Sequence, residues 1–243
     1  QLTRASYQGW YCTPDETFWT EAELGQPHPT GLEGWGGQPA GAKGPLCPGC
    51  QRPLEPVSED GWMLPLRASQ GWLKRFVETH EQFVQPATRY NELSALLERP
   101  LPEALCITRP RQRVGWGIPV PFSPQHVVYV WFDALLNYIT VPGFVDDQAR
   151  FAQLWPADVH FIGKDILRHH AVYWPIMLHA LGIPDEQMPR RIFAHGWWKV
   201  GEQKMSKSLG NIIDPTAVIG QLLNDQPFAA DVYRYFLLRE IPF

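Results

Sequence analysis

The 243-residue sequence has only four cysteines, few charged side chains (19%) and no long apolar run. Four cysteines are too few for a disulfide-dense secreted domain, so we expect a reduced, cytoplasmic setting. No stretch approaches the roughly 20 apolar residues that span a membrane. The first residues, QLTRASYQGWYC, also lack the basic and then apolar pattern of a signal peptide. The sequence therefore predicts a protein without membrane partners.

Two further absences concern the start of the chain and the nucleotide-binding motifs. The sequence has no initiator methionine, so we expect it to be an internal segment of a longer gene product. Gly163-Lys164 is not a phosphate-binding P-loop, because position 158 is Asp and position 165 is Asp. The glycine fingerprint of dinucleotide-binding folds is missing as well. Any nucleotide site must therefore be built in another way.

One stretch is unusually basic for a chain of net charge −4 and pI near 6.1. Between positions 190 and 207, five basic residues oppose one acidic residue, which gives a local charge of +4. These are Arg190, Arg191, Lys199, Lys204 and Lys207 against Glu202. The stretch runs from an apolar, strand-like segment into a loop rich in Lys, Ser and Gly. We expect this loop to contact phosphate, while the low pI argues against extensive coating by nucleic acid.

The first 60 residues, rich in Gly and Pro, contain a candidate metal site. Cys47-Pro-Gly-Cys50 predicts a tight turn that directs two thiolates to one point, as a structural zinc requires. Cys12 is the third candidate ligand, and a fourth must be a residue other than cysteine. Asp15 stands where a second CxxC cysteine would be expected, and His28 is its competitor. A redox pair, or thiols left from a site that no longer binds metal, are the alternatives.

Helical periodicity is clear between residues 61 and 105. One apolar-periodic segment starts at Ser69 or Gln70, and a second follows Pro86. Their apolar positions are Trp72, Leu73, Phe76, Val77, Tyr90, Leu93, Leu96 and Leu97. These positions predict the core faces of a small helical appendage without catalytic residues.

Three strand-like segments follow, with helical patterns between them. The apolar run Val127–Phe132 predicts a strand buried on both faces of a parallel sheet. Val159–Asp165 predicts a short strand followed by a helix that Asp165 caps and Pro175 kinks. Ile192–Val200 predicts a third strand, and a helix then starts at Asp214-Pro215. This alternation indicates β-α-β units and a layered parallel sheet.

Several polar and aromatic residues fall near the expected carboxyl ends of strands, where ligands bind in open α/β sheets. Asp133 fits either such a site or a helix N-cap, and Trp131 fits either a site or core packing. His170 shares a helix face with Ile166 and Trp174. A single histidine on an apolar face is usually a core residue, so by itself it is a weak indication of a ligand site.

Together, these segments resemble a known family. KMSKS at 204–208 is the second signature of class I aminoacyl-tRNA synthetases. The sequences WGIPVP (116–121), YVWFDALLNY (129–138), FIGKDIL (161–167) and HHAVYWPIMLHALGIP (169–184) are similar to methionyl-tRNA synthetases of the bacterial type. The resemblance implies an α/β fold, namely the C-terminal half of a Rossmann-type parallel-sheet catalytic domain. It also implies a small zinc-knuckle and helical connective-peptide insertion domain.

The resemblance implies three domains. Residues 1–120 would form the insertion, with the knuckle at 12–50 and the helical part at 61–105. Residues 121–213 would form the second half of the catalytic domain, and 214–243 the start of a helical stem-contact region. The implied reaction joins methionine and ATP, with Mg²⁺, into methionyl-adenylate. The methionyl group then moves to methionine tRNA.

The resemblance also assigns residues to these ligands. Lys204 and Lys207 would be catalytic and would contact the triphosphate, with Ser206 and Asp165 also binding ATP. The methionine pocket would be lined by Trp131, Ala134, Tyr138, Ile166 and His170. An apolar, aromatic pocket suits a polarizable thioether. Structural zinc would be held by Cys12, Asp15, Cys47 and Cys50.

The sequence departs from the family in two ways. Asp15 stands where the family's knuckle has cysteine, which puts metal affinity in doubt. The HIGH motif is absent, as is the anticodon-binding domain expected after Phe243, so we expect this chain alone to be inactive. Two alternatives are a class I synthetase for Leu, Ile, Val or Cys and a non-catalytic zinc-binding or tRNA-binding paralogue. The sequence does not indicate an oligomeric state.

Overall fold

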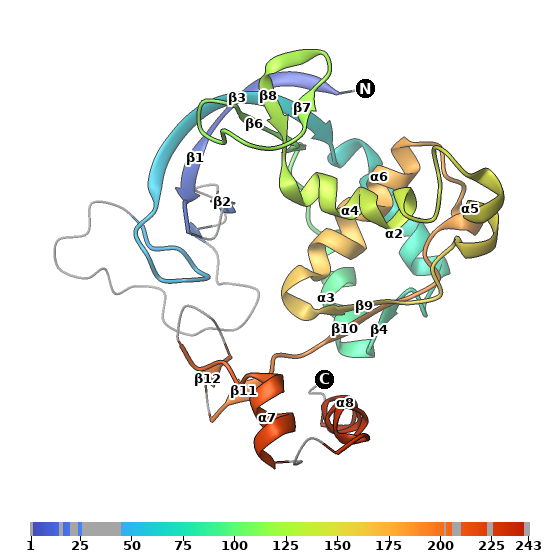
Figure 1. The fold of residues 1–243 in the computed structure, drawn as a ribbon. Coiled ribbons are helices and arrows are strands. Elements are labelled where there is room, and N and C mark those ends of the chain that lie inside the picture. The colour runs from blue at the N-terminus through green and yellow to red at the C-terminus, as the bar shows by residue number, and fades with distance from the viewer. Residues whose placement is uncertain are drawn as a thin grey trace. The chain divides into compact units, whose positions relative to one another are not determined.

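A computed structural model describes residues 2–14, 17–19, 24–25, 45–201, 203–205, 210–222 and 226–240 (Figure 1). Contacts between Cα atoms divide the chain into two compact units. The first comprises Gln1–Ser69 and Leu101–Thr140, and the second comprises Gln70–Pro100 and Val141–Phe243. Each unit is therefore built from two segments that are distant in the sequence.

The first unit is built around an antiparallel sheet with the strand order β2-β1-β3-β5. Its strands are β1 (Thr3–Cys12), β2 (Thr17–Trp19), β3 (Glu55–Pro65) and β5 (Ala104–Cys106). β1 and β3 form a long curved ribbon (Figure 1), paired from Thr3 opposite Met63 to Tyr11 opposite Glu55. The ribbon ends at Cys12, which brings this cysteine close to the turn before β3.

A second antiparallel sheet of this unit has the order β6-β8-β7. It consists of β6 (Thr108–Pro110), β7 (Pro119–Val120) and β8 (Ser123–Val128), and helix α4 (Val130–Thr140) follows at once. The prediction of a parallel strand at Val127–Phe132 is therefore wrong. The apolar run belongs to the end of an antiparallel strand and the first turn of a helix, and a short apolar run does not distinguish these structures.

The second unit contains the predicted parallel sheet, with the order β4-β10-β9. Its strands are β4 (Val84–Gln85), β9 (His160–Gly163) and β10 (Ile192–His195). β10 lies between the other two and pairs parallel to both, from Ile192 opposite His160 to His195 opposite Gly163. The third predicted strand is shorter than expected, because β10 ends at His195 and residues up to Val200 belong partly to a hairpin.

The connection from β9 to β10 is helical but irregular. It comprises a 3₁₀ turn (Lys164–Ile166), a π-helical turn (His169–Tyr173) and α6 (Trp174–Ala180), and a 3₁₀ turn (Asp185–Gln187) follows. Pro175 lies at the start of α6, where its missing N–H is tolerated, and a π-helical turn directly precedes it. The kink expected at Pro175 stays a prediction. Gly182, at φ 82°, ends the helix as predicted. Asp165 is not an N-cap, because Gly163 occupies that position and Asp165 lies inside the turn.

Five other helices lie within the described residues. Helices α2 (Arg67–Thr79) and α3 (Ala87–Leu97) confirm the helical part predicted from periodicity. They bury Leu73, Phe76, Val77, Leu93 and Leu97. Helix α5 (Gln148–Leu154) precedes β9, and Asp147 caps it by accepting the Arg150 N–H at 2.9 Å.

After β10, the hairpin strands β11 (Lys199–Val200) and β12 (Gln203–Lys204) lead to α7 (Pro215–Leu222) and α8 (Ala229–Arg239). The start of α7 agrees with the sequence, since Thr216 N–H donates to Asp214 Oδ1 at 2.9 Å.

Throughout the described ranges, every helix is too short or too polar to cross a membrane.

Candidate functional site

Three cysteines converge at one end of the first unit. Cys12 ends β1, and Cys47 and Cys50 lie in a tight turn in which Gln51 N–H donates to Cys47 O at 2.9 Å. The three sulfur atoms lie within 4.8 Å of one another, and Cys12 Sγ is 3.4 Å from Cys50 Sγ. Cys12 and Cys47 are fully buried, beside Leu54. The sequence prediction that these three side chains meet is therefore confirmed.

This donor set fits a zinc ion. Tetrahedral zinc with Zn–S distances of about 2.3 Å holds its sulfurs roughly 3.8 Å apart. The observed separations, 3.4 Å for Cys12 and Cys50 and at most 4.8 Å for any pair, are compatible with that value. The structure records these cysteines as thiols, which can ionise and bind metal. Three thiolates leave one tetrahedral position for another ligand. Asp15 and His28, the two candidates for it, lie outside the described residues.

The carboxyl ends of β9 and β10 form a second cluster. Gly163 ends β9, and a Cβ atom at this position would lie 2.5 Å from Asp165 Oδ1. Glycine therefore lets the exposed Asp165 carboxylate fold back against the strand end. The Lys164 ammonium lies 4.2 Å from the centre of the Trp197 ring, which follows β10. A carboxylate, a cation and an aromatic ring are thus grouped at the sheet edge where ligands usually bind.

The basic loop follows directly from this edge. Lys199 pairs with Lys204 across the β11–β12 hairpin, and Met205 N–H donates to Trp198 O at 2.9 Å. The hairpin therefore fixes the position of the Lys204 backbone. Ser206 and Lys207 lie outside the described residues, so their assignment to ATP stays a prediction.

His170 and Ile166 lie together in the second unit. His170 is 2% exposed, and its Nδ1 lies 3.0 Å from Ile166 O, where it donates a hydrogen bond. Burial lowers the pKa of His170, and it lowers the pKa values of His160 and His169 to about 4, helped by the nearby His170. These histidines are therefore neutral near pH 7. In neutral His170, Nδ1 carries the proton and Nε2 is an acceptor.

The other predicted methionine contacts lie in the first unit, on α4. Trp131, Ala134 and Tyr138 are spaced by three and four residues and therefore share one helix face. Trp131 and Tyr138 are half-buried, and burial raises the pKa of the Tyr138 hydroxyl. Asp133, which the sequence left open between N-cap and site residue, lies within the first turn of α4 and is exposed. The structure thus describes the two halves of the predicted pocket in separate units.

Sequence reasoning missed a cavity of about 270 Å³ in the first unit. It is lined by residues that include Tyr11, Arg109, Trp116, Tyr129 and Asp133. The Arg109 guanidinium lies 3.8 Å from the centre of the Tyr129 ring, and Arg109 is only 5% exposed. A buried arginine at a cavity wall is uncommon and is a candidate binding group. The sequence carries no local signal for it, since the direct neighbours of Arg109 are Thr108 and Pro110.

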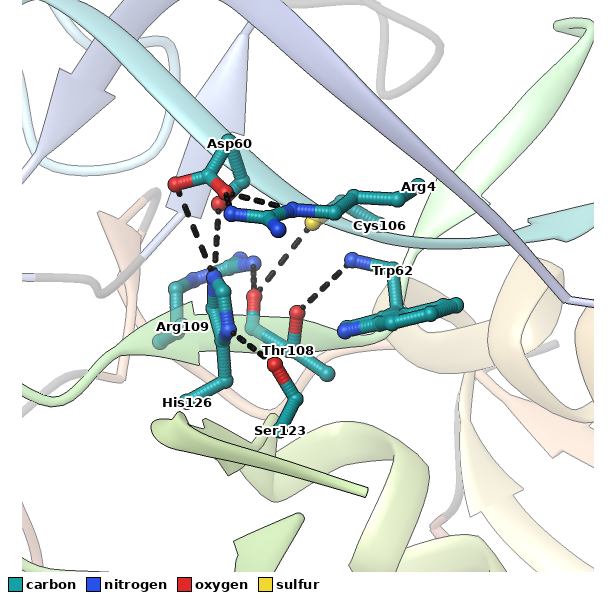
Figure 2. A network of polar contacts seen from close by, with 8 residues as sticks. All are labelled: Arg4, Asp60, Trp62, Cys106, Thr108, Arg109, Ser123 and His126. Carbon is teal, nitrogen blue, oxygen red and sulfur yellow. Dashed lines mark hydrogen bonds and ion pairs between the residues drawn. The ribbon is translucent and has the colours of Figure 1, made fainter.

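Arg109 of the cavity wall also belongs to a polar network (Figure 2). The network links Arg4, Asp60, Trp62, Cys106, Thr108, Arg109, Ser123 and His126. Thr108 O accepts from Arg109 Nη1 at 2.8 Å, while Thr108 Oγ1 accepts from Trp62 N–H at 2.9 Å. The hydrogen bond from Arg4 holds the pKa of Asp60 below its usual range. Through Thr108, the network joins β3, which carries Trp62, to the Arg109 side chain.

Comparison with known proteins identifies the family. A profile described as tRNA synthetases class I (M) matches residues 1–243. The chain belongs to this synthetase family. The resemblance carried by KMSKS and its neighbouring segments is thereby confirmed.

Relatives of this synthetase chain are methionine–tRNA ligases. The enzyme of Clostridium perfringens is 44% identical over 243 residues, which is 100% of this chain and 33% of that protein. The enzyme of Thermotoga maritima is 42% identical over 237 residues, or 98% of this chain and 34% of that protein. The chain thus spans about a third of the length of these curated relatives.

Solved structures agree with the α/β fold class. The methionyl-tRNA synthetase of Mycobacterium tuberculosis bound by methionyl-adenylate has a TM-score of 0.78 and 40% identity. The match covers 100% of this chain and 43% of the M. tuberculosis chain. The free form of the M. tuberculosis enzyme gives a TM-score of 0.75 at 37% identity, over 100% of this chain and 42% of that one. The comparisons give no support to a synthetase for another amino acid or to a non-catalytic paralogue.

Proposed function

We propose that this chain is part of a methionine–tRNA ligase. The observation that supports this most strongly is 44% identity to the C. perfringens methionine–tRNA ligase over all 243 residues. In the proposed reaction, a methionine carboxylate oxygen attacks the α-phosphate of ATP and pyrophosphate leaves. The methionyl group of the adenylate is then transferred to a ribose hydroxyl at the 3′ end of methionine tRNA, and AMP leaves.

In this proposal, ATP binds with Mg²⁺ at the carboxyl ends of β9 and β10. Asp165 contacts the nucleotide, and Lys204, Ser206 and Lys207 contact the triphosphate. The two lysines stabilise negative charge as pyrophosphate leaves, a purely electrostatic role that needs no proton transfer. The position of the β11–β12 hairpin immediately after β10 supports this, because it starts the basic loop at the same sheet edge.

Methionine would bind against Trp131, Ala134, Tyr138, Ile166 and His170. Two aromatic rings and an isoleucine suit the methyl thioether, and a neutral His170 adds one polar group without a buried charge. The shared face of Trp131, Ala134 and Tyr138 on α4 supports this assignment.

Structural zinc would be held by Cys12, Cys47 and Cys50, with Asp15 as the fourth ligand and His28 as its competitor. The burial and mutual distances of the three thiols support zinc. A bound ion would join the end of β1 to the turn before β3 and so stabilise the insertion domain, which we assign to residues 1–120. We assign residues 121–213 to the catalytic half-domain and 214–243 to a stem-contact region, in a cytoplasmic enzyme.

Methionine-dependent exchange of pyrophosphate into ATP by the full-length protein tests the proposal. We expect exchange that requires methionine and is not supported by leucine, isoleucine, valine or cysteine. The 243-residue chain alone should be inactive. Exchange that depends on another amino acid, or none at all with the full-length protein, would contradict the proposed function.

A further inference from the structure

A histidine that the sequence did not assign to the methionine pocket packs beside His170 in the second unit. His160 is the first residue of β9 and is 5% exposed. The indole N–H of Trp174, a fully buried side chain, donates to His160 Nε2 at 3.3 Å. Because Nε2 accepts this bond, its lone pair must be free of a proton. His160 is therefore in the tautomer that carries hydrogen on Nδ1.

The surroundings of His160 hold its ring in this state. The ring packs 6.5 Å from the Trp155 ring, and Trp155 packs edge-to-face against Trp174 at 6.2 Å. Trp155 is itself fixed by an indole hydrogen bond of 2.8 Å to Gln187 O. Burial keeps the pKa of His160 near 4, so the acceptor is present at neutral pH. An aromatic cluster with matched hydrogen bonds has little freedom to rotate.

The same ring borders His170. The two imidazole centres are 6.2 Å apart with planes tilted by 59°. On its other side, His170 is tied to Ile166 O at 3.0 Å. His170 and Trp174 are one turn apart across the π-helical segment, so His160 contacts the inner side of the helix at both positions.

We propose that His160 is a positioning residue for methionine recognition: the Trp174 indole hydrogen bond holds the His160 ring, and this ring packs beside His170 and restricts the orientation of the His170 imidazole. His160 does not touch the substrate. It acts through two side chains of the π-helical segment. This inference rests on the proposed function, in which His170 contacts methionine.

The contribution of the acceptor can be separated from that of ring volume. His160→Leu replaces the imidazole with an apolar side chain of similar size, and it leaves the buried Trp174 N–H without its acceptor. His160→Gln offers an amide oxygen near the position of Nε2. Trp174→Phe removes the donor instead. His179→Gln is the control, because His179 is exposed on the same helix and stacks on Trp72, away from His160.

The experiment measures steady-state pyrophosphate exchange by the full-length protein as a function of methionine and of ATP. We expect His160→Leu, which strands the buried Trp174 N–H, and Trp174→Phe, which removes that donor, each to raise the methionine KM about tenfold, because either change frees the ring beside His170. The ATP KM should stay unchanged. His160→Gln should restore most of the methionine affinity, and His179→Gln should behave like the unaltered enzyme. Combining His160→Leu with Trp174→Phe should add little to either change alone, since both remove one interaction.

The outcomes separate this inference from the proposed function. An unchanged methionine KM in both His160→Leu and Trp174→Phe would overturn the inference, as would equal increases for methionine and ATP, which indicate a general structural defect. If His160→Leu does not fold, Trp174→Phe and His160→Gln decide the question by the same criteria. Absence of methionine-dependent exchange in the unaltered enzyme would overturn the proposed function and this inference with it.

Discussion

Acidification should destabilise the second unit through its buried histidines. His160 and His169 have pKa values of about 4 in the folded protein, against 6.5 for an unperturbed histidine. Between pH 6.5 and pH 4, each of these histidines is protonated in the unfolded chain and neutral in the folded protein. The free energy of unfolding therefore falls as the pH falls through this range. A shift of about 2.5 units corresponds to about 3 kcal/mol for one histidine. The two together contribute less than twice that amount, because each pKa is lowered partly by the shared neighbour His170.

Urea unfolding of the full-length protein at pH 7 and pH 4.5, followed by intrinsic tryptophan fluorescence, measures this effect. The variant His160→Gln lacks one titrating group while keeping an acceptor for Trp174. We therefore expect it to lose about 2 to 3 kcal/mol less than the unaltered protein between the two pH values. If both proteins lose the same free energy, His160 does not titrate as its burial requires, and the reasoning fails.

Substitutions in the cysteine cluster and at Gly163 test the other sites. Cys47→Ser should lower the zinc content measured by elemental analysis and the melting temperature by about 5 °C or more, whereas Cys106→Ser, outside the cluster, should change neither. Full zinc content in Cys47→Ser would contradict the metal site, and loss of zinc in Asp15→Ala would identify the fourth ligand. Gly163→Ala places a methyl group against Asp165 Oδ1 and should raise the ATP KM several-fold with little change in melting temperature. An unaltered ATP KM in Gly163→Ala would contradict the proposed contact between Asp165 and the nucleotide.

Local sequence patterns predicted the features that depend on a few consecutive residues. Gly182 ends a helix because only glycine adopts φ 82° without strain, and Asp214-Pro215 starts one because both residues suit its first turn. The CxxC turn at Cys47 and Cys50 brings the thiols together through its own backbone hydrogen bonds. Each of these outcomes is determined within about five residues.

The errors arose where partners distant in the sequence decide the structure. Val128 N–H donates to Ile118 O, and Tyr129 N–H donates to Ile107 O, so pairing with two separate segments fixes where β8 ends. The apolar run Val127–Phe132 does not itself indicate that Ile118 and Ile107 are its hydrogen-bond partners. Arg109 was missed for the same reason, because Tyr129 and Thr108 determine its burial and its own sequence neighbours do not reveal a cavity.

His170 shows that a histidine can be packed in the core and still be available to a ligand. A buried imidazole has two nitrogens, and one backbone carbonyl satisfies only one of them. Ile166 O accepts from Nδ1, which makes His170 a well-packed core residue and fixes its tautomer at the same time. That tautomer presents Nε2 as a hydrogen-bond acceptor of defined direction. The packing that would argue against a functional role is therefore what gives His170 a single orientation, and His160 behind it belongs to the same arrangement.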